Sequence, residues 1–264
     1  MRQAWTRLHL AVAAIALASS CTAFASQADA LTFQQRDVAR VISLGGTCNQ
    51  CELSGRDLSG ARMAGASFNN STFIGSNLRG ASLLGSNFSS SDFERADIRG
   101  ANLAGSTFRN SALEQARMTG VVAAGTNFEG SDLTRASMDD AELTGAVFRA
   151  ADLTGVDFRG SRLLGATLVN VDATRANLTR AELVSANMSS SDFTSANFTG
   201  ARLDNARLRS SDFSRANFQN ASLRRTDIRG ADLSEARNLT QSQINQACGD
   251  HSTELPRGLR VSTC

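Results

Sequence analysis

An apolar residue returns at every fifth position of this 264-residue chain from Leu53 to Leu233, without one insertion or deletion. The period covers 37 positions, of which 35 are Leu, Phe, Met or Ile and two are alanines, Ala123 and Ala173. Neither an α-helix, with 3.6 residues per turn, nor a flat strand, which alternates every two residues, places every fifth residue on one side. A strict short repeat of this kind predicts a solenoid, in which each unit is stabilised by its neighbours.

The residues around each apolar centre follow a fixed order. A small residue (Ala, Ser or Thr) stands two positions before the centre in 32 of the 37 repeats, and Asp or Asn is most frequent directly before it. Alternate residues of an extended segment share a face, so the centre and the small residue should point inward and the polar residue outward. All 17 glycines of the tract lie two positions after a centre, where a tight turn can demand a positive φ. Each unit is therefore predicted to be a very short strand followed by a corner.

Phenylalanines report how many units make one circuit. Among the centres, seven Phe pairs are separated by 20 residues, against four by 5, one by 10 and three by 15. Stacked coils place like residues above one another, so four units and 20 residues per circuit are predicted. One unbroken core column contains Phe68, Phe88, Phe108, Phe128 and Phe148.

The repeat units match a known consensus. Residues 151–155 (ADLTG) and 231–235 (ADLSE) fit A(D/N)LXX, and the tract, about seventy per cent of the chain, resembles the pentapeptide-repeat family. The resemblance implies an all-β fold, a right-handed quadrilateral β-helix of about nine coils. At a spacing of ~4.8 Å per coil, the rod is roughly 45 Å long. We expect this solenoid to span residues 51–237, between short capping segments at 31–50 and 238–264.

The first residues have the features of an export signal. Arg2 and Arg7 precede an apolar run over 8–18 that is too short to span a bilayer, and small-x-small sites allow cleavage after residue 25 or after residue 30. We therefore expect residues 1–25 to be a signal peptide and the mature protein to be periplasmic or secreted in a bacterium. A lipoprotein-type site before Cys21 is the alternative, which would leave a lipid anchor on that cysteine. No other stretch predicts a transmembrane segment.

Four cysteines remain after either cleavage, and an even number in an exported protein favours disulfides. Half-cystine α-carbons must lie within about 7 Å, so no bridge can connect the two ends of the rod. The expected pairs are Cys48–Cys51 and Cys248–Cys264. Exported members of the family open with similar CxxC(D/E)LSG sequences. A redox site or a zinc site at the CxxC pair is the alternative, although neither a βαβ pattern nor further zinc ligands accompany it.

Both ends carry signs of capping elements. Residues 31–44 predict a short helix or edge segment before the repeat. After it, Thr240 and Gln243 form the sequence pattern of a capping box, Leu239 and Ile244 that of a hydrophobic staple, and Gly249 a stop after about two helical turns. Such caps protect the open ends of a solenoid.

No catalytic, cofactor or metal site is predicted. The one mature histidine, His251, lies in the C-terminal tail, so no Ser-His-Asp arrangement can form on the coils. Residues 51–237 contain 21 arginines and 21 acidic residues, a balance that argues against nucleic-acid binding.

Two surface ladders are notable at 20- or 40-residue spacing. The arginines Arg95, Arg135, Arg175 and Arg215 suit anions, and the hydroxyl residues Thr134, Thr154, Thr174, Thr194, Ser214 and Ser234 suit a crystalline surface such as ice.

These features predict a non-enzymatic exported rod that acts as a structural or protein-interaction scaffold, with an unidentified protein as partner. The resemblance also suggests a homodimer through a solenoid end. An alternative function, known in the same family, is protection of DNA gyrase against quinolones. That alternative requires a cytosolic location and an acidic rod, whereas this tract is balanced in charge.

Overall fold

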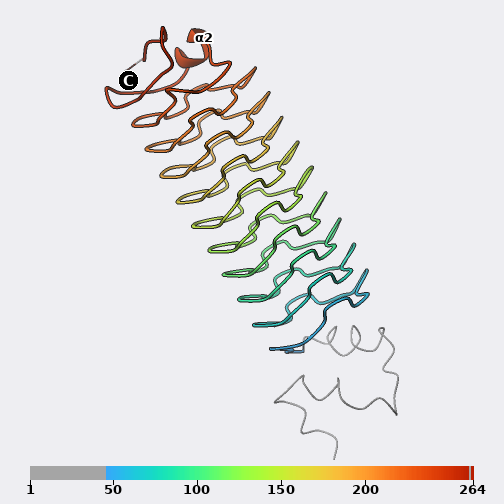
Figure 1. Ribbon diagram of the computed structural model, residues 1–264. Helices are drawn as coiled ribbons and strands as arrows, with labels where there is room; N and C mark the ends of the chain where they lie inside the picture. The colour runs from blue at the N-terminus through green and yellow to red at the C-terminus, as the bar shows by residue number, and fades with distance from the viewer. Residues whose placement is uncertain (1–45, 262) are drawn as a thin grey trace, which may run out of the picture.

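The computed structural model describes residues 46–261 together with residues 263 and 264. This part of the chain forms a right-handed quadrilateral β-helix, a rod of stacked coils (Figure 1). Its β-structure consists of isolated parallel bridges, because each side of a coil is only a few residues long before the next corner. Every bridge from Thr47–Ser67 to Asn217–Arg237 joins residues twenty positions apart. The twenty-residue circuit expected from the phenylalanine spacing is confirmed.

The corners are turns with left-handed backbone. An N–H three residues after most centres donates to the centre's carbonyl, as from Ala61 to Leu58 (3.0 Å). The residue two after the centre has a φ between +53° and +69° at every repeat from Gln50 to Gly230. Glycine occupies seventeen of these corners, and the other twenty are mostly Arg, Asn and Ser, for which this conformation costs roughly 1–2 kcal/mol. The corner N–H offsets part of that cost by donating to the next coil, as from Arg95 to Glu114 (2.9 Å).

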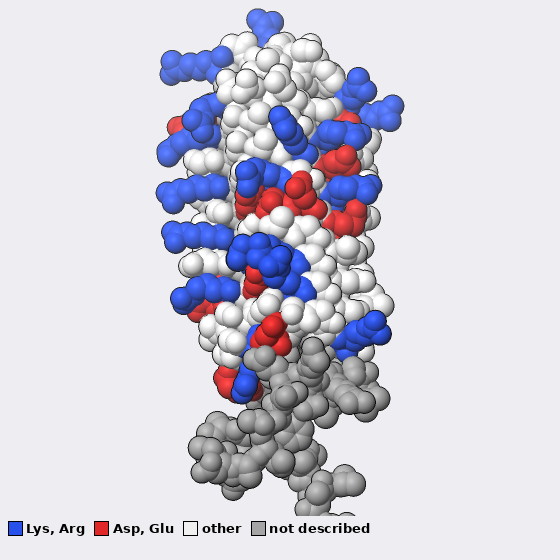
Figure 2. Space-filling view, turned by 90° about the vertical axis from the view of Figure 1, so that its right-hand side faces the viewer, with Lys and Arg blue, Asp and Glu red and all other residues white. Residues whose placement is uncertain are grey.

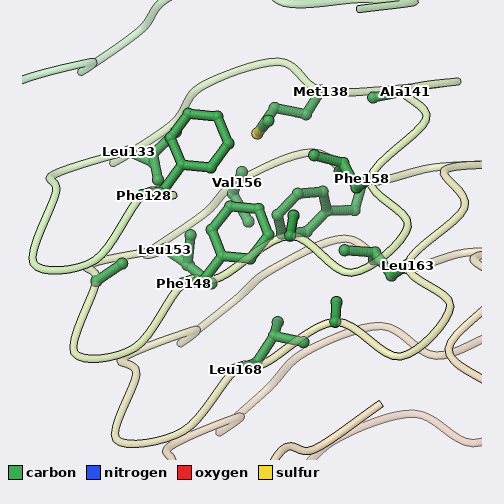
Figure 3. Close-up of a cluster of buried hydrophobic side chains, with 14 of the residues drawn as sticks. Phe128, Leu133, Met138, Ala141, Phe148, Leu153, Val156, Phe158, Leu163 and Leu168 are labelled. Carbon is green, nitrogen blue, oxygen red and sulfur yellow. The ribbon is translucent and has the colours of Figure 1, made fainter. Parts of the chain in front are cut away.

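The interior is a set of side-chain columns that run along the rod. All seven phenylalanine pairs separated by twenty residues are stacked, with ring centroids 4.5–5.5 Å apart and interplanar angles of 4–21°. Phe128 lies over Phe148 in one column, and Phe158 meets Phe148 edge-on from the column on the opposite side of the coil (Figure 3). Stacked rings add about 0.5–1.5 kcal/mol per pair to the free energy gained from burial.

Alanine at two centres is matched by a larger neighbour. Ala123 and Ala173 replace the usual Leu or Phe, and the position two residues earlier, normally Ala or Ser, is Val121 or Val171. All four side chains are buried. Because the valine restores part of the volume that alanine lacks, the interior stays filled, as volume-conserving exchanges allow.

Buried hydroxyls at the small position bind the coils together. Ser91 donates to the carbonyl of Phe68 (2.7 Å), Ser111 to that of Phe88 (2.8 Å) and Thr126 to that of Leu103 (2.8 Å). In each case the carbonyl belongs to the preceding coil. These hydroxyls are thus satisfied, which is why Ser and Thr can replace alanine at the small position. Ser76 is an exception, because its buried hydroxyl has no hydrogen-bond partner among the described residues.

The C-terminal segment covers the last coil. Helix α2 (Gln241–Ile244) begins at Thr240 with the expected capping box, and the Gln243 amide also donates to the carbonyls of Phe218 (2.8 Å) and Ala221 (2.9 Å). The helix is shorter than the sequence predicts: it is one turn long and ends at Ile244, with Asn245 rather than Gly249 as the residue that stops it. The chain then returns to the rod, but Cys248 pairs with Asp227 and Glu254 with Asp232, separations of 21 and 22 residues. The helix interrupts the twenty-residue register.

The predicted signal peptide, Cys21 and the segment 31–44 lie outside the described residues.

Candidate interaction surfaces

One side of the rod carries the same Asp-x-Thr/Ser sequence in six consecutive coils, and we call it the aspartate face. Parallel bridges connect each aspartate to the next one along the rod, which places neighbouring backbones about 4.8 Å apart. The aspartates are Asp132, Asp152, Asp172, Asp192, Asp212 and Asp232, and the hydroxyl residues are Thr134, Thr154, Thr174, Thr194, Ser214 and Ser234. Like charges directly opposite one another repel, so this column is not arranged for stability alone.

Each aspartate also holds the turn that follows it. Its Oδ1 accepts a hydrogen bond from the backbone N–H two residues later, at 2.7–2.9 Å in all six coils. Asn87 and Asn197 make the same bond with Ser89 and Thr199 elsewhere on the rod (both 3.1 Å). The local structure therefore needs an oxygen at this position but not a charge.

Within the part of the chain that the structure describes, the aspartates of the aspartate face lack the ion pairs that several aspartates on other sides of the rod form. Asp97, Asp157 and Asp227 pair with Arg99, Arg159 and Arg229 at 2.6–2.7 Å, whereas none of the six aspartates forms an ion pair among the described residues. The six carboxylates each keep an oxygen that the turn does not use. Figure 2 shows one side of the rod, on which acidic and basic side chains are interspersed.

The predicted hydroxyl ladder is a column of this same face. The backbone N–H groups of its members are held by the aspartates, and the Thr174 hydroxyl donates to Asp172 (2.6 Å). The hydroxyls therefore lie among carboxylates and do not form a separate flat array.

The predicted arginine ladder lies at corners beside the aspartate face. Arg95, Arg135, Arg175 and Arg215 all have positive φ. Arg95 pairs with Glu94, and Arg215 with Glu235 (2.9 Å). The neighbouring aspartate column would repel any anion that approaches these arginines. A cationic partner would instead be attracted to the aspartate column.

Glu114 extends the aspartate face towards the N-terminal end. Burial raises the pKa of its carboxyl, and the nearby charges of Asp132 and Asp92 raise it further. Its Oε2 is buried and has no hydrogen-bond partner among the described residues. The protein tolerates an unfavourable carboxylate here as well, which adds to the acidic character of this side.

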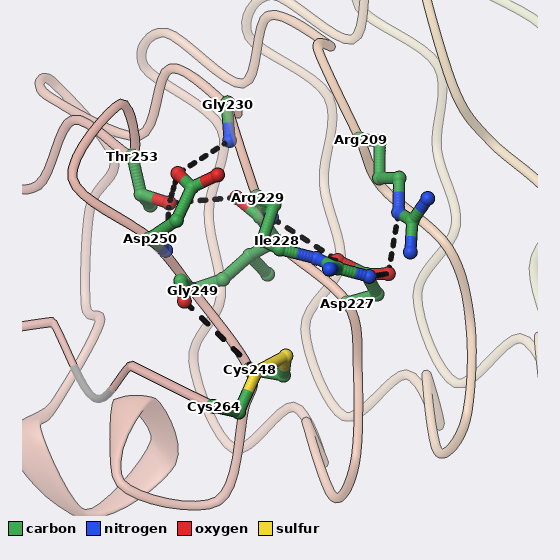
Figure 4. The surroundings of a disulfide bond; sticks show 10 residues. All are labelled: Arg209, Asp227, Ile228, Arg229, Gly230, Cys248, Gly249, Asp250, Thr253 and Cys264. Carbon is green, nitrogen blue, oxygen red and sulfur yellow. Dashed lines mark hydrogen bonds and ion pairs between the residues drawn. A yellow bond between two sulfur atoms is a disulfide. The ribbon is translucent and has the colours of Figure 1, made fainter.

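The four expected half-cystines form two disulfides at opposite ends of the rod. Cys48 is joined to Cys51 and Cys248 to Cys264, with α-carbons 5.6 and 5.5 Å apart. The second bridge fastens the chain end beside the strand-like segment at Gly249 (Figure 4). Cys51 fills the small position before the first centre, Leu53, and is buried. This places the N-terminal bridge against the core of the first coil.

No candidate metal site is present in the described residues. They contain no group of three His, Cys, Asp or Glu side chains able to hold a metal ion. His251 is exposed in the C-terminal tail. A shallow hollow between the last coil and the tail is lined by Arg209, Arg229 and Asp250, among others, but both guanidiniums are already paired with Asp227 (2.5 and 2.7 Å; Figure 4). No helix in the described range has the length and apolar character needed to cross a bilayer.

Two family profiles described as pentapeptide repeats match the chain. One matches residues 48–85, 113–149, 141–180, 151–189 and 174–209, and the other residues 68–112 and 193–237. Together with the twenty-residue coils and the A(D/N)LXX units, these matches define the class of protein: a β-helical repeat solenoid. The chain belongs to the pentapeptide-repeat family.

Among similar solved structures, HetL supports the fold. HetL, a pentapeptide repeat protein involved in heterocyst differentiation regulation from the cyanobacterium Nostoc sp. strain PCC 7120, is 25% identical, with a TM-score of 0.65 over 82% of this chain and 97% of HetL. The plasmid-mediated fluoroquinolone resistance protein QnrB1 is 19% identical over 78% of this chain and 91% of its own, with a TM-score of 0.42. A pentapeptide repeat protein from the Arabidopsis thaliana thylakoid lumen is 28% identical over 49% and 79%, with a TM-score of 0.24. No curated protein matches the sequence.

Proposed function

We propose that the protein is an exported, non-enzymatic rod that binds a protein partner in the bacterial envelope, and that the aspartate face is its binding surface. The single observation that carries this proposal is the column of six aspartates without ion pairs. A column of like charges costs stability, and asparagine would hold the turns equally well. A cationic surface that meets the column would remove the repulsion and gain charge complementarity.

The partner's chemistry follows from that arrangement. It presents basic side chains in a row and contacts the hydroxyls that lie between the carboxylates. HetL, which has the same fold, is involved in the regulation of heterocyst differentiation, and a regulatory role is compatible with a rod that binds other proteins. Protection of a topoisomerase is the weaker alternative, because the 21 arginines and 21 acidic residues of the tract balance.

A pull-down from envelope extracts tests the aspartate face with a matched control. The variant Asp152→Asn/Asp172→Asn/Asp192→Asn removes three charges but keeps the oxygens that hold the turns. The control Asp97→Asn/Asp157→Asn/Asp227→Asn makes the same change on aspartates that are paired with arginine. We expect the same partner with the unmodified protein and the control, and its loss with the first variant. Equal recovery by all three proteins would contradict the proposal.

Export is tested separately by fractionation and by the mass of the mature N-terminus. Cleavage after residue 25 or 30 places the protein in the periplasm or outside the cell, and lipid on Cys21 would identify an anchored form. An intact Met1 on a cytosolic protein would refute export and favour the topoisomerase alternative. The proposal that the hydroxyl ladder binds ice is checked by thermal hysteresis, which we expect to be absent.

A further inference from the structure

A second side of the rod has the opposite character to the aspartate face. In three consecutive coils, over 81–85, 101–105 and 121–125, it carries no charged residue, although residues 51–237 as a whole contain 42 charged residues. We call its outward residues the uncharged patch: Ser82, Leu84, Asn102, Ala104, Val122 and Ala124. Leu84 and Val122 are the large hydrophobic side chains that stand out as exposed in the described residues, at 47% and 43%.

Charges of opposite sign border the patch at equal distances. Arg62 lies two coils before Ala104, and Glu142 lies two coils after it. Each of these two residues stands directly before the apolar centre of its own unit. Arg62 is exposed and forms no ion pair among the described residues. Glu142 pairs with Arg162 (2.9 Å), the first step of a chain of ion pairs that continues to Glu182 and Arg202.

This order makes the patch complementary to itself. A twofold axis across the rod at the level of Asn102 and Ala104 reverses the coil order but keeps each column opposite its own copy. Leu84 then meets Ala124 of the second copy, and Val122 meets Ser82 of the second copy, so each large side chain faces a small one. Arg62 meets Glu142 of the second copy, and the symmetry repeats all three contacts.

The corners permit close approach. The corner residues of the three coils are Gly85, Gly105 and Gly125, and space around each is open within 4 Å of where a side chain would begin. Two such sides can therefore come together without side chains at the corners that hold them apart.

We propose that two copies of this protein associate side by side and antiparallel through the uncharged patch. The proposal does not depend on the aspartate face. The contact covers five coils, about 24 Å of rod length. Because a standard interface buries about 800 Å² on each partner and this strip is smaller, the dimer is a weak one. It also differs from association through a solenoid end, where the C-terminal segment already covers the last coil.

Sedimentation equilibrium of the purified protein over a wide concentration range tests the dimer. In Ala104→Arg, two guanidiniums meet on the axis, and we expect the dissociation constant to rise at least tenfold. The matched control is Ala112→Arg, the same change on the opposite side of the same coil, and it should leave the constant unchanged. Both alanines are partly exposed, and circular dichroism verifies that each variant is folded.

A size exchange tests the antiparallel register. Ala124→Leu alone places two leucines opposite each other and should weaken association, whereas Leu84→Ala/Ala124→Leu restores a large residue facing a small one and should return the dissociation constant to within about threefold of the original. A protein that stays monomeric up to about 1 mM, or a dimer equally sensitive to Ala104→Arg and Ala112→Arg, overturns the proposal. Failure of the size exchange to restore association also refutes this register.

Discussion

Truncation of Phe108 to alanine measures how much the stacked columns contribute to stability. The Phe108 ring is fully buried and has three ring neighbours: it stacks on Phe88 (4.9 Å) and Phe128 (5.5 Å) and meets Phe93 edge-on (5.2 Å). Removal of a buried phenylalanine ring costs about 3–5 kcal/mol. Because the cavity would also separate two stacked neighbours, we expect the upper end of that range.

Phe158→Ala is the matched control. Phe158 is equally buried but has one ring neighbour among the described residues, Phe148, at 5.7 Å and edge-on. The two variants lose the same atoms but differ by two ring contacts, each worth about 0.5–1.5 kcal/mol. Phe108→Ala should therefore be less stable than Phe158→Ala by roughly 1–3 kcal/mol.

Urea unfolding followed by circular dichroism measures both differences. The comparison holds where the slope of unfolding free energy against urea is unchanged between variants, since a solenoid can unfold in part. Equal destabilisation by the two changes, or a larger effect of Phe158→Ala, would show that ring stacking along the rod is not a stabilising force.

Three further predictions concern register, charge and the cap. Insertion of one residue after Asn127 should destabilise the rod more than deletion of residues 122–141, because the deletion removes one whole circuit and keeps each side-chain column aligned, whereas the insertion shifts the columns. Equal melting temperatures of the two variants would contradict a twenty-residue circuit. Glu114→Gln should stabilise the protein at neutral pH, because the pKa of Glu114 is raised in the folded state and its ionised form is disfavoured there. The gain in stability should vanish as the pH falls below 4.5, where the carboxyl of the unfolded chain is also protonated. A gain in stability that persists in acid would refute this cause. Cys264→Ser removes a disulfide with a sequence separation of 16 and should lower the stability of the C-terminal segment by about 3 kcal/mol. Amide hydrogen exchange should become faster at Ile228 and Leu233, whose N–H groups donate to the carbonyls of Cys248 and Glu254. Exchange at Phe108, in the middle of the rod, should not change.

The fold could be predicted from the sequence because its determinants are local and repeated. Each unit of five residues carries its own buried centre, its outward polar residue and its corner, so the period alone indicates a solenoid. The columns also followed from the sequence, since phenylalanines twenty residues apart stack whenever the circuit is regular. The corners required more than the sequence pattern: glycine marked seventeen of them, but twenty other residues adopt the same conformation. Most of these twenty donate a backbone hydrogen bond to the next coil, as the glycine corners also do.

Prediction from the sequence was less accurate where the repeat ends or changes. The capping box at Thr240 was predictable because it involves residues three apart, but the helix length was not. One turn suffices because the side chain of Gln243 binds carbonyls of the last coil, and the chain then returns to pair at Asp227. In the sequence, Ala123 and Ala173 interrupt the series of large apolar centres. Only their burial beside Val121 and Val171 explains how the interior accommodates these small side chains.

The sequence by itself determined that this chain winds into a twenty-residue coil, because every unit repeats the same short-range instructions. The tertiary structure decided which charges are free. Arginines two residues away or one coil away neutralise Asp97 and Asp227. By contrast, the four inner aspartates of the aspartate face bridge only to other aspartates: Asp152, Asp172, Asp192 and Asp212. Whether a surface charge is paired depends on residues in neighbouring coils and on the direction of each side chain. Those relations exist only once the coils are stacked.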